Sequence, residues 1–561
     1  MNVDHSRLDD LRAGQGEIAN HVIDEFVAGR ISRRDLLRRG AVVGISLPVL
    51  SGILAACGGS STSSKPSGGG GTSAAGANAT IKAGIITPSG DINPVTVADQ
   101  GGLDMLAQTG EYLALSDQTL TLKPVLATSW SSNSGADVWT FKIRQGVKFH
   151  NGQPMTADDV VYTFQTLTTK GANPTLAGVV QPSGVKKVDD FTVAFHLQAP
   201  NGNFPYLVSS DNYNTIIMQK GQDPTKWVTN FPGTGPFTFK SYTPNVGASF
   251  ARNESYWGKK ALPAATEFTF YGTETPGVLA LTGGTIDVLG QFSVSGGPQL
   301  LNGQFNVSKL KSSAHRELSM RNDKAPFTDA RVRRAVALTL DRPAIVKSLF
   351  NGFADLGNDS PFAPVFPSTD TSVAQRAKDI AQAKSLLHAA GHPNGFSVPL
   401  YANAVQEIPD YAQIVQQSAK AIGVDIAVHA QPSSTYYGKA TFGNSNWLDA
   451  TMSLVDYGHR GVPNAFLTNP LQAINSKTGT GAWNAAHFNN SQYDKLAAQY
   501  IAAVDLTTQR QIAGQIENLL LTQTPIIYGY FYNYLSAWAK NVAGVYPTAI
   551  GHLFLYNATK S

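Results

Sequence analysis

Apolar and polar residues alternate around position 140, and the spacing then changes to that of a helix. Residues 139–144 (WTFKIR) place apolar side chains at every second position, the pattern of a half-buried strand, and residues 147–150 (VKFH) repeat it after Gly146. Thr156 stands where a helix N-cap is expected, with two aspartates in the first turn and apolar residues at helical spacing as far as Leu167. The stretch predicts two short strands followed by a helix, in an α/β or α+β protein.

Several segments resemble those of a known family in their residue patterns and in their order along the chain. The segments are 126–164, 233–239 (GTGPFTF), 252–258 (RNESYWG), 279–288 (LALTGGTIDV) and 327–342 (FTDARVRRAVALTLDR). Together they resemble the family 5 extracellular solute-binding proteins, the peptide- and nickel-chelate-binding subunits of ABC importers. The resemblance implies an α/β, two-lobed periplasmic-binding-protein-like fold with an additional inserted domain, which closes on its ligand by hinge motion.

The resemblance also implies how the chain is divided. We expect a signal peptide at 1–57, a tether at 58–79, the first lobe at 80–112, the additional domain at 113–231, the first lobe again at 232–318, the second lobe at 319–525 and a return to the first lobe at 526–561. In the second lobe the pattern predicts helices over 377–390 and 411–422, a strand over 424–428, and an apolar strand over 525–532 that crosses back.

A helix is predicted after Phe327, with Thr328 or Asp329 as its cap. Apolar residues recur four apart on one of its faces. Its arginines, at 331, 333 and 334, invite comparison with a phosphate site. We interpret them instead as a solvated helix face with ion pairs.

Composition bounds the class of protein. The 561 residues suffice for two or three domains with sizeable cores. Charged residues make up only 15% and the net charge is +4, which does not suggest a nucleic-acid partner. A single cysteine excludes an internal disulfide and a cysteine metal cluster.

The first eighty residues read as export and anchoring signals. Residues 32–37 (SRRDLL) resemble the twin-arginine signal, with Arg33 and Arg34 as the pair. The apolar stretch 41–56 is shorter than the roughly 20 residues of a membrane-spanning helix. It ends in a lipobox-like LAAC, in which Cys57 takes the lipid, and a Gly/Ser-rich tether follows. We expect an extracytoplasmic protein, lipid-anchored to the cell membrane at the cell surface or in the periplasm.

Motifs of catalysis and metal binding are not found. The sequence has no G-x-S-x-G, H-E-x-x-H, Walker lysine or G-x-G-x-x-G. His388 and His392 are four apart, but Gly391 ends the helix between them, so we interpret them as part of a C-terminal turn. We expect no enzymatic activity, no cofactor and no metal site.

The segment 452–460 (MSLVDYGHR) corresponds to the family's ligand-binding run, W-x-x-D with an acidic follow-on. The resemblance implies that Asp456 takes the α-ammonium group of the ligand and that the backbone pairs with an extended peptide. Tyr457 and Ser453 are then expected beside the ligand, as are Ala98 and Gln100 from the loop after the first strand.

Two departures bear on the ligand. Ser453 replaces the family's tryptophan, and Gly458-His459-Arg460 replaces the acidic follow-on. Asp456 alternatively pairs with Arg460, and the site would then suit a neutral or anionic ligand.

We therefore predict the substrate-binding subunit of an ABC importer. It captures an oligopeptide-like solute as a monomer and delivers it to a membrane permease and ATPase complex. A nickel or haem chelate or a sugar is the alternative ligand. A surface-anchored hydrolase or a ligand sensor is the alternative of another class.

Overall fold

The computed structural model describes residues 78–561, except 91, 170–172, 174, 177 and 476–479, together with Ile23, Phe26 and Val27. Met1–Ser73 and Ala74–Ser561 form two compact units, and the sheets belong to the second. Cys57, Arg33 and Arg34 lie outside the described residues, as does the predicted signal peptide except for Ile23, Phe26 and Val27. No helix in the described part of the chain has the length and apolar character to cross a membrane.

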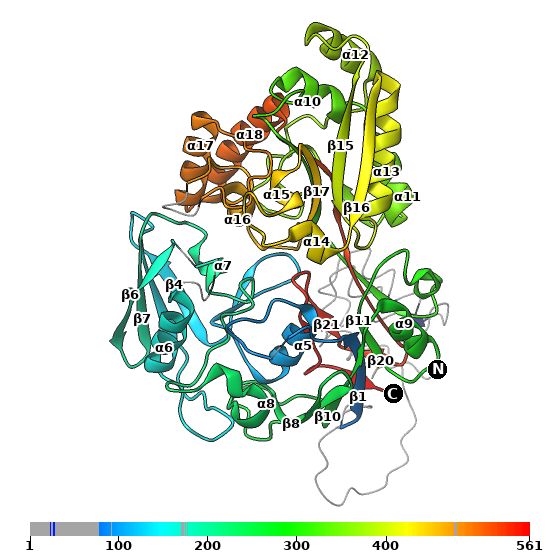
Figure 1. Cartoon of the computed structure of the whole chain (residues 1–561). Helices are drawn as coiled ribbons and strands as arrows, with labels where there is room; N and C mark the ends of the chain where they lie inside the picture. The colour runs from blue at the N-terminus through cyan, green and yellow to red at the C-terminus, as the bar shows by residue number, and fades with distance from the viewer. Residues whose placement is uncertain are drawn as a thin grey trace, which may run out of the picture. The chain divides into compact units, whose positions relative to one another are not determined.

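The first lobe is built on a seven-stranded mixed sheet, in the order β12-β19-β11-β1-β10-β9-β8 (Figure 1). Its strands are β1 (Thr80–Ile86), β8 (Phe237–Thr243), β9 (Gly247–Arg252), β10 (Ala265–Tyr271), β11 (Val288–Phe292), β12 (Asn306–Leu310) and β19 (Tyr534–Trp538). β1 runs parallel to both β10 and β11, so their carboxyl ends meet at one edge. The helices α5 (Gln100–Thr109) and α9 (Glu274–Thr282) follow β1 and β10.

A four-stranded antiparallel sheet lies within the predicted additional domain, in the order β4-β5-β7-β6. The elements of this part are β2 (Ala114–Ser116), β3 (Leu122–Pro124), β4 (Ala127–Ser132), β5 (Val138–Ile143), α6 (Ala157–Thr168), β6 (Val180–Asp189), β7 (Thr192–Leu197), α7 (Phe204–Leu207), η1 (Pro224–Lys226) and α8 (Trp227–Asn230). α6 packs on β6 and β7 (Figure 1). The limits 113 and 231 of the domain stay a prediction.

The local predictions for this part are confirmed except for one strand. β5 buries the three apolar residues of 139–144, and α6 begins at the capping box formed by Thr156 and Asp159. Residues 147–150 do not form the predicted second strand; they make only the bridge between Lys148 and Pro154. A tight turn begins directly at Phe149, whose carbonyl accepts a hydrogen bond from the Gly152 N–H at 2.8 Å. The segment before this turn is therefore too short to form a longer strand pairing.

The second lobe has a six-stranded sheet, in the order β14-β18-β13-β17-β15-β16. Its strands are β13 (His315–Met320), β14 (Ala354–Leu356), β15 (Phe396–Asn403), β16 (Val424–Gln431), β17 (Met452–Tyr457) and β18 (Ile526–Tyr532). The core on one face is shared with α10 (Ala330–Ala337), α11 (Arg342–Phe350), α12 (Ile380–Ala389), α13 (Ile408–Ala419) and η3 (Lys420–Ile422). The core on the other is shared with α14 (Ser433–Tyr437), α15 (Asn446–Asp449), α16 (Asn464–Thr468), α17 (Ser491–Ala502) and α18 (Leu506–Gln523). The predicted helices 377–390 and 411–422 are thus confirmed, with shifted ends.

Short elements complete the chain. They are η2 (Pro298–Leu301), β20 (Val542–Ala543), β21 (Tyr546–Pro547), β22 (Leu553–Phe554) and β23 (Thr559–Lys560). β20 pairs with β23, and β21 pairs with β22.

The chain passes between the two large sheets at residues 311–314 and again at Asn533. The expected crossing at 526 is wrong, because Ile526–Tyr532 is buried on both faces and pairs with β13 and β14 in the second sheet. That sheet likewise takes its first strand from 315 rather than 319. The two crossings are tied together: the Ser312 hydroxyl donates to the Tyr532 carbonyl at 2.5 Å.

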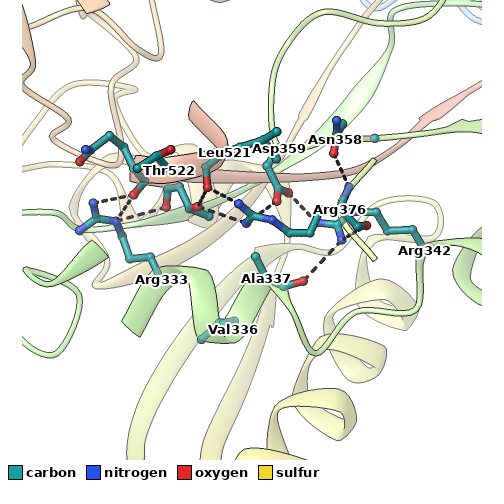
Figure 2. A network of polar contacts seen from close by, with 12 residues as sticks. Arg333, Val336, Ala337, Arg342, Asn358, Asp359, Arg376, Leu521 and Thr522 are labelled. Carbon is teal, nitrogen blue, oxygen red and sulfur yellow. Dashed lines mark hydrogen bonds and ion pairs between the residues drawn. The ribbon is translucent and has the colours of Figure 1, made fainter. Parts of the chain in front are cut away.

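The interpretation of the arginines after Asp329 as a solvated face is wrong for Arg333. Its guanidinium, labelled Arg333 in Figure 2, is buried and donates to the carbonyl of Gln523 at 2.6 Å, where α18 ends. In the same network Arg342 and Arg376 lie on either side of the buried Asp359, at 2.7 and 2.8 Å. A helix C-terminus leaves carbonyls without internal partners, and a guanidinium satisfies them. These arginines hold the second lobe together and do not form a phosphate site.

Candidate functional site

The candidate site lies where parallel strands of the two large sheets end. In open α/β sheets, ligands bind outside the carboxyl ends of the strands. β1, β10 and β11 of the first lobe end at Ile86, Tyr271 and Phe292. All three residues line one cavity together with Gln406 and Glu407, which follow β15 of the second lobe. The carboxyl ends of the two sheets therefore face a common space.

Asp456 lies at the end of β17 and is half-buried. Its carboxylate accepts a hydrogen bond from the Tyr437 hydroxyl at 2.6 Å and a longer one from the Asn403 amide at 3.4 Å. No ion pair with Arg460 forms in the described chain, because the Arg460 guanidinium instead donates to the carbonyl of His459 at 2.8 Å. The carboxylate is oriented by neutral partners.

A buried cation stands opposite Asp456. Arg316 pairs with Asp456 across the β13–β17 ladder, on the same face of the sheet. Its guanidinium donates to Glu407 at 2.8 Å and to Gln406 at 2.7 Å, and it lies 4.4 Å from the centre of the Tyr532 ring. One positive charge and two negative charges leave this cluster with a net charge of −1. We call Arg316, Glu407, Tyr532 and Asp456 the anchor cluster.

Tyr457 and Ser453 lie on the other face of β17, since successive side chains of a strand point to opposite faces. Both are buried. Tyr457 stacks on His315 at 5.6 Å between ring centroids and packs near Trp483 at 6.0 Å. The structure does not bring either side chain beside the Asp456 carboxylate.

Ala98 and Gln100 come from the loop between β1 and α5 and from the start of α5. Ala98 is exposed, and the amide of Gln100 donates to the Tyr534 hydroxyl in β19. Neither residue has a contact with Asp456 in the described structure. Their predicted ligand contact remains a prediction.

The backbone of β17 has one side open for an added strand. β13 pairs with it from Met452 to Tyr457, but β15 pairs with it only from Met452 to Leu454. The end of β17 from 455 to 457 therefore lacks a ladder partner on the β15 side. This is the place at which an extended peptide would pair, as the resemblance implies.

The cavity beside the anchor cluster has a volume of about 190 Å³. Its walls come from both lobes and include Phe292 on one side and Phe350 and Phe353 on the other. Sequence reasoning missed it, together with Arg316 and Glu407. The available signal was the polar pair Gln406-Glu407, between an apolar strand and a helix.

The additional domain contacts the second lobe directly. The Asn203 amide donates to Asn464 at 2.9 Å and accepts from Gln509 at 3.0 Å, and the Gly202 N–H donates to the carbonyl of Ile501 at 2.8 Å. A Cβ atom on Gly202 would lie 1.9 Å from the carbonyl oxygen of Ala503. The two parts approach too closely here for any side chain at position 202.

A second contact joins the same parts next to the anchor cluster. Asp211 of the additional domain is buried against Gly461, whose added Cβ would lie 1.8 Å from the carboxylate. Burial raises the pKa of Asp211 to about 7, although a hydrogen bond from Ser116 and the charge of Arg460 lower it in part. Arg460 therefore faces a carboxyl group of the other part and not Asp456.

The loop between these two sites is fixed to the first crossing. His459 is buried, and its Nδ1 accepts a hydrogen bond from the Ser313 N–H at 3.0 Å. Burial and the neighbouring Arg460 lower the pKa of His459 to about 3, so the ring is neutral. The loop that follows Asp456 thus links the anchor cluster, the crossing and the additional domain.

Residues 121–468 match the family model described as "Bacterial extracellular solute-binding proteins, family 5 Middle". The chain belongs to this family. The family predicted from the sequence is thereby confirmed.

Several binding proteins of other bacteria match most of the chain. Heme-binding protein A of Haemophilus influenzae is 25% identical over 449 residues, 72% of this chain and 78% of that protein. The dipeptide-binding protein DppE of Bacillus subtilis is 24% identical over 479 residues, 78% and 84% of the two chains. The periplasmic murein peptide-binding protein MppA of Escherichia coli is 26% identical over 476 residues, 78% and 85%.

Solved structures show the same fold. HbpA2 from Haemophilus parasuis superposes with a TM-score of 0.74 at 22% identity, covering 86% of this chain and 100% of that one. DppA from Helicobacter pylori, in complex with the peptide STSA, gives 0.70 at 19% identity, covering 86% and 98%. NikZ from Campylobacter jejuni, in complex with Ni(L-His), gives 0.69 at 19% identity, covering 86% and 99%. The predicted α/β, two-lobed fold of this family 5 protein is confirmed.

Metal ligation was not predicted for this family 5 chain. Within the described ranges, no three His, Cys, Asp or Glu side chains gather as a metal site.

Proposed function

We propose that this protein is the substrate-binding subunit of an ABC importer and captures an oligopeptide-like solute by its free amino group. The observation that carries the proposal is the net charge of −1 in the anchor cluster, with Asp456 at the edge where the two sheets meet. The solute then passes to a permease and ATPase complex. The names of the relatives, a dipeptide-binding protein and a murein peptide-binding protein, support this ligand class.

The anchor cluster has the properties that an ammonium group requires. Tyr437 and Asn403 hold the Asp456 carboxylate in place before a ligand arrives. A hydrogen bond from an ammonium to a carboxylate is shorter and stronger than one between neutral groups. Glu407 already neutralises Arg316, so the positive charge of the ligand is left to balance Asp456.

A metal or haem chelate is the second candidate ligand. It is supported by the name of the haem-binding relative and by the nickel–histidine complex of NikZ.

The protein works outside the cytoplasm as a monomer, anchored by lipid at Cys57 after export through the twin-arginine route. The lipobox and the Arg33-Arg34 pair support this part of the proposal. The Gly/Ser tether of residues 58–79 lets the anchored fold reach a permease in the same membrane.

The test is an Asp456→Asn substitution, which keeps the shape and removes the charge. Removing one partner of a desolvated pair costs about 3–5 kcal/mol, so binding is expected to weaken by roughly two to three and a half powers of ten. Calorimetric titration with a peptide mixture, and then with N-acetylated peptides, measures this loss. The exposed Asp425 in β16 provides the matched control, Asp425→Asn, which should leave affinity unchanged. Equal affinity of the wild type for free and acetylated peptides would refute the amino-group anchor.

A further inference from the structure

The cavity beside the anchor cluster has the size of one ring. Its volume is about 190 Å³, whereas an engineered apolar cavity of about 150 Å³ holds benzene. The apolar part of its wall includes Leu289, Phe292 and Leu535 of the first lobe and Phe350 and Phe353 of the second. Protein interiors contain few voids larger than a water molecule. A cavity of this size at the proposed ligand site has room for one ring-sized group.

The charges on the wall select against acidic groups. Glu407 lines the cavity but is neutralised by Arg316 at 2.8 Å. Glu274 lines it too and accepts hydrogen bonds from the backbone N–H and the hydroxyl of Ser293. Among the described residues no cation forms an ion pair with Glu274. One cation lies at the wall, since the Lys309 ammonium is 4.1 Å from the centre of the Phe353 ring. A carboxylate placed in the cavity would still meet the charge of Glu274, whereas an apolar group would not.

The cavity and the amino-group anchor adjoin each other. The Arg316 guanidinium bonds Gln406 and Glu407, which line the cavity, while its backbone pairs with Asp456. One arginine side chain thus separates the carboxylate from the cavity. A peptide bound by its amino group at Asp456 has a side chain within reach of this space.

We propose that the cavity receives one apolar, ring-sized side chain of the bound peptide and rejects acidic side chains. This inference rests on the proposed function and adds the specificity of the site. The side chain completes the closed state, because the cavity wall exists only when both lobes contribute to it. A ligand that binds one of two states better shifts the population toward that state.

The test uses trialanine and its variants with Phe, Leu or Glu at each position in turn, titrated calorimetrically into the full chain. Burial of an apolar side chain of this size strengthens binding by about one to two orders of magnitude. A Phe peptide should therefore bind about 10- to 100-fold more tightly than trialanine. The Glu peptides should bind more weakly than trialanine at every position that favours Phe. Equal affinity for the Phe and alanine peptides would overturn the proposal.

Two variants of α9 localise the effect. Thr273 lines the cavity, is exposed and makes no side-chain cap, so Thr273→Trp fills the space from its mouth without disturbing the core. It should remove the preference for Phe, so that the Phe peptides bind this variant no more tightly than trialanine does. Thr275 is exposed on the same helix but does not line the cavity, so Thr275→Trp is the matched control and should keep the preference. A preference for Phe that survives in Thr273→Trp would place the ring elsewhere and refute the assignment.

A small probe separates the two proposals. Benzyl alcohol, followed by ligand-observed NMR, should bind saturably to the wild type and to Thr275→Trp, but not to Thr273→Trp. Failure of benzyl alcohol to bind the wild type overturns the cavity assignment, whatever peptides do. If free and N-acetylated peptides bind with equal affinity, the proposed function is overturned. If binding requires the free amino group but the affinity does not depend on the size of the side chain, only the present inference is overturned.

Discussion

Closure of the lobes is expected to take up a proton at Asp211. This carboxyl group belongs to the additional domain, but it is buried against Gly461 of the second lobe, and the charge of Arg460 lowers its pKa in part. Separation of the two parts would return Asp211 to water and its pKa toward the ordinary value of 3.8, from about 7 in the closed form. Between these values the closed form holds a proton that the open form has lost. Closure is therefore favoured at low pH and becomes weaker as the pH rises from about 4 to about 7.

The size of this effect follows from the shift. Each pKa unit corresponds to ~1.4 kcal/mol, so the shift from 3.8 to about 7 sets an upper limit of ~4 kcal/mol on the cost of closing at pH 8. An Asp211→Asn substitution keeps the shape and removes the titration. A ligand that requires the closed form should bind this variant more tightly at pH 8, by up to about three powers of ten, and equally well at pH 4.

Calorimetric titration with the best peptide at pH 4, 5, 6, 7 and 8 measures both quantities. Repeating it in buffers of different ionisation enthalpy counts the protons taken up, which should approach one near pH 5.5 in the wild type and fall in the variant. Asp223→Asn is the matched control, because Asp223 belongs to the same domain and is exposed. Identical proton uptake in the wild type and in Asp211→Asn would show that closure does not bury this carboxyl group.

Three further outcomes are expected. Cys57→Ala should move the protein from the membrane to the soluble fraction, and fatty-acid labelling of this variant would contradict lipidation at Cys57. Replacing Arg33 and Arg34 together by lysine should leave precursor in the cytoplasm, because the twin-arginine route reads the guanidinium pair; unimpaired export would indicate the general secretory route. Glu111 is buried and its pKa is raised to about 7, so the wild type should lose ~3 kcal/mol of stability between pH 4.5 and 8. Glu111→Gln should abolish this loss. Urea unfolding with the same pH dependence in both forms would contradict this.

Elements set by neighbours in sequence were predicted well. The strand at 139–144 and the capped helix after Thr156 depend on side-chain alternation and on a local capping box, and both are present. The apolar run 526–532 was assigned to the wrong sheet, because its residues are apolar on both faces and the sequence does not say which sheet buries them. Arg333 was misread for a similar reason, since its partner at Gln523 is 190 positions away.

The candidate site was predicted only at the residue that a family motif marks. Asp456 was proposed from its motif, and its ligand contact stays a prediction. Arg316 and Glu407, which decide the charge around it, come from separate segments that meet only in the folded protein. Tyr457 and Ser453 were placed beside it by adjacency in sequence. The alternation of the strand turns both toward the opposite core.

The hydrogen bond between Ser312 and Tyr532 ties the two crossings together, so the lobes turn about a single hinge axis at this point. When a lobe turns about a hinge axis, each of its atoms moves in proportion to its distance from that axis. Tyr532 and Asn533 line the cavity, so the cavity lies close to the hinge axis and widens little for a given rotation of the lobes. The α7 and α16 segments lie to one side of the red return strand in Figure 1, and their contact between Asn203 and Asn464 travels further. A permease that grips the outer ends of the two lobes would therefore work with a long lever: it would break the distant amide contacts with little force and release the innermost part of the solute last.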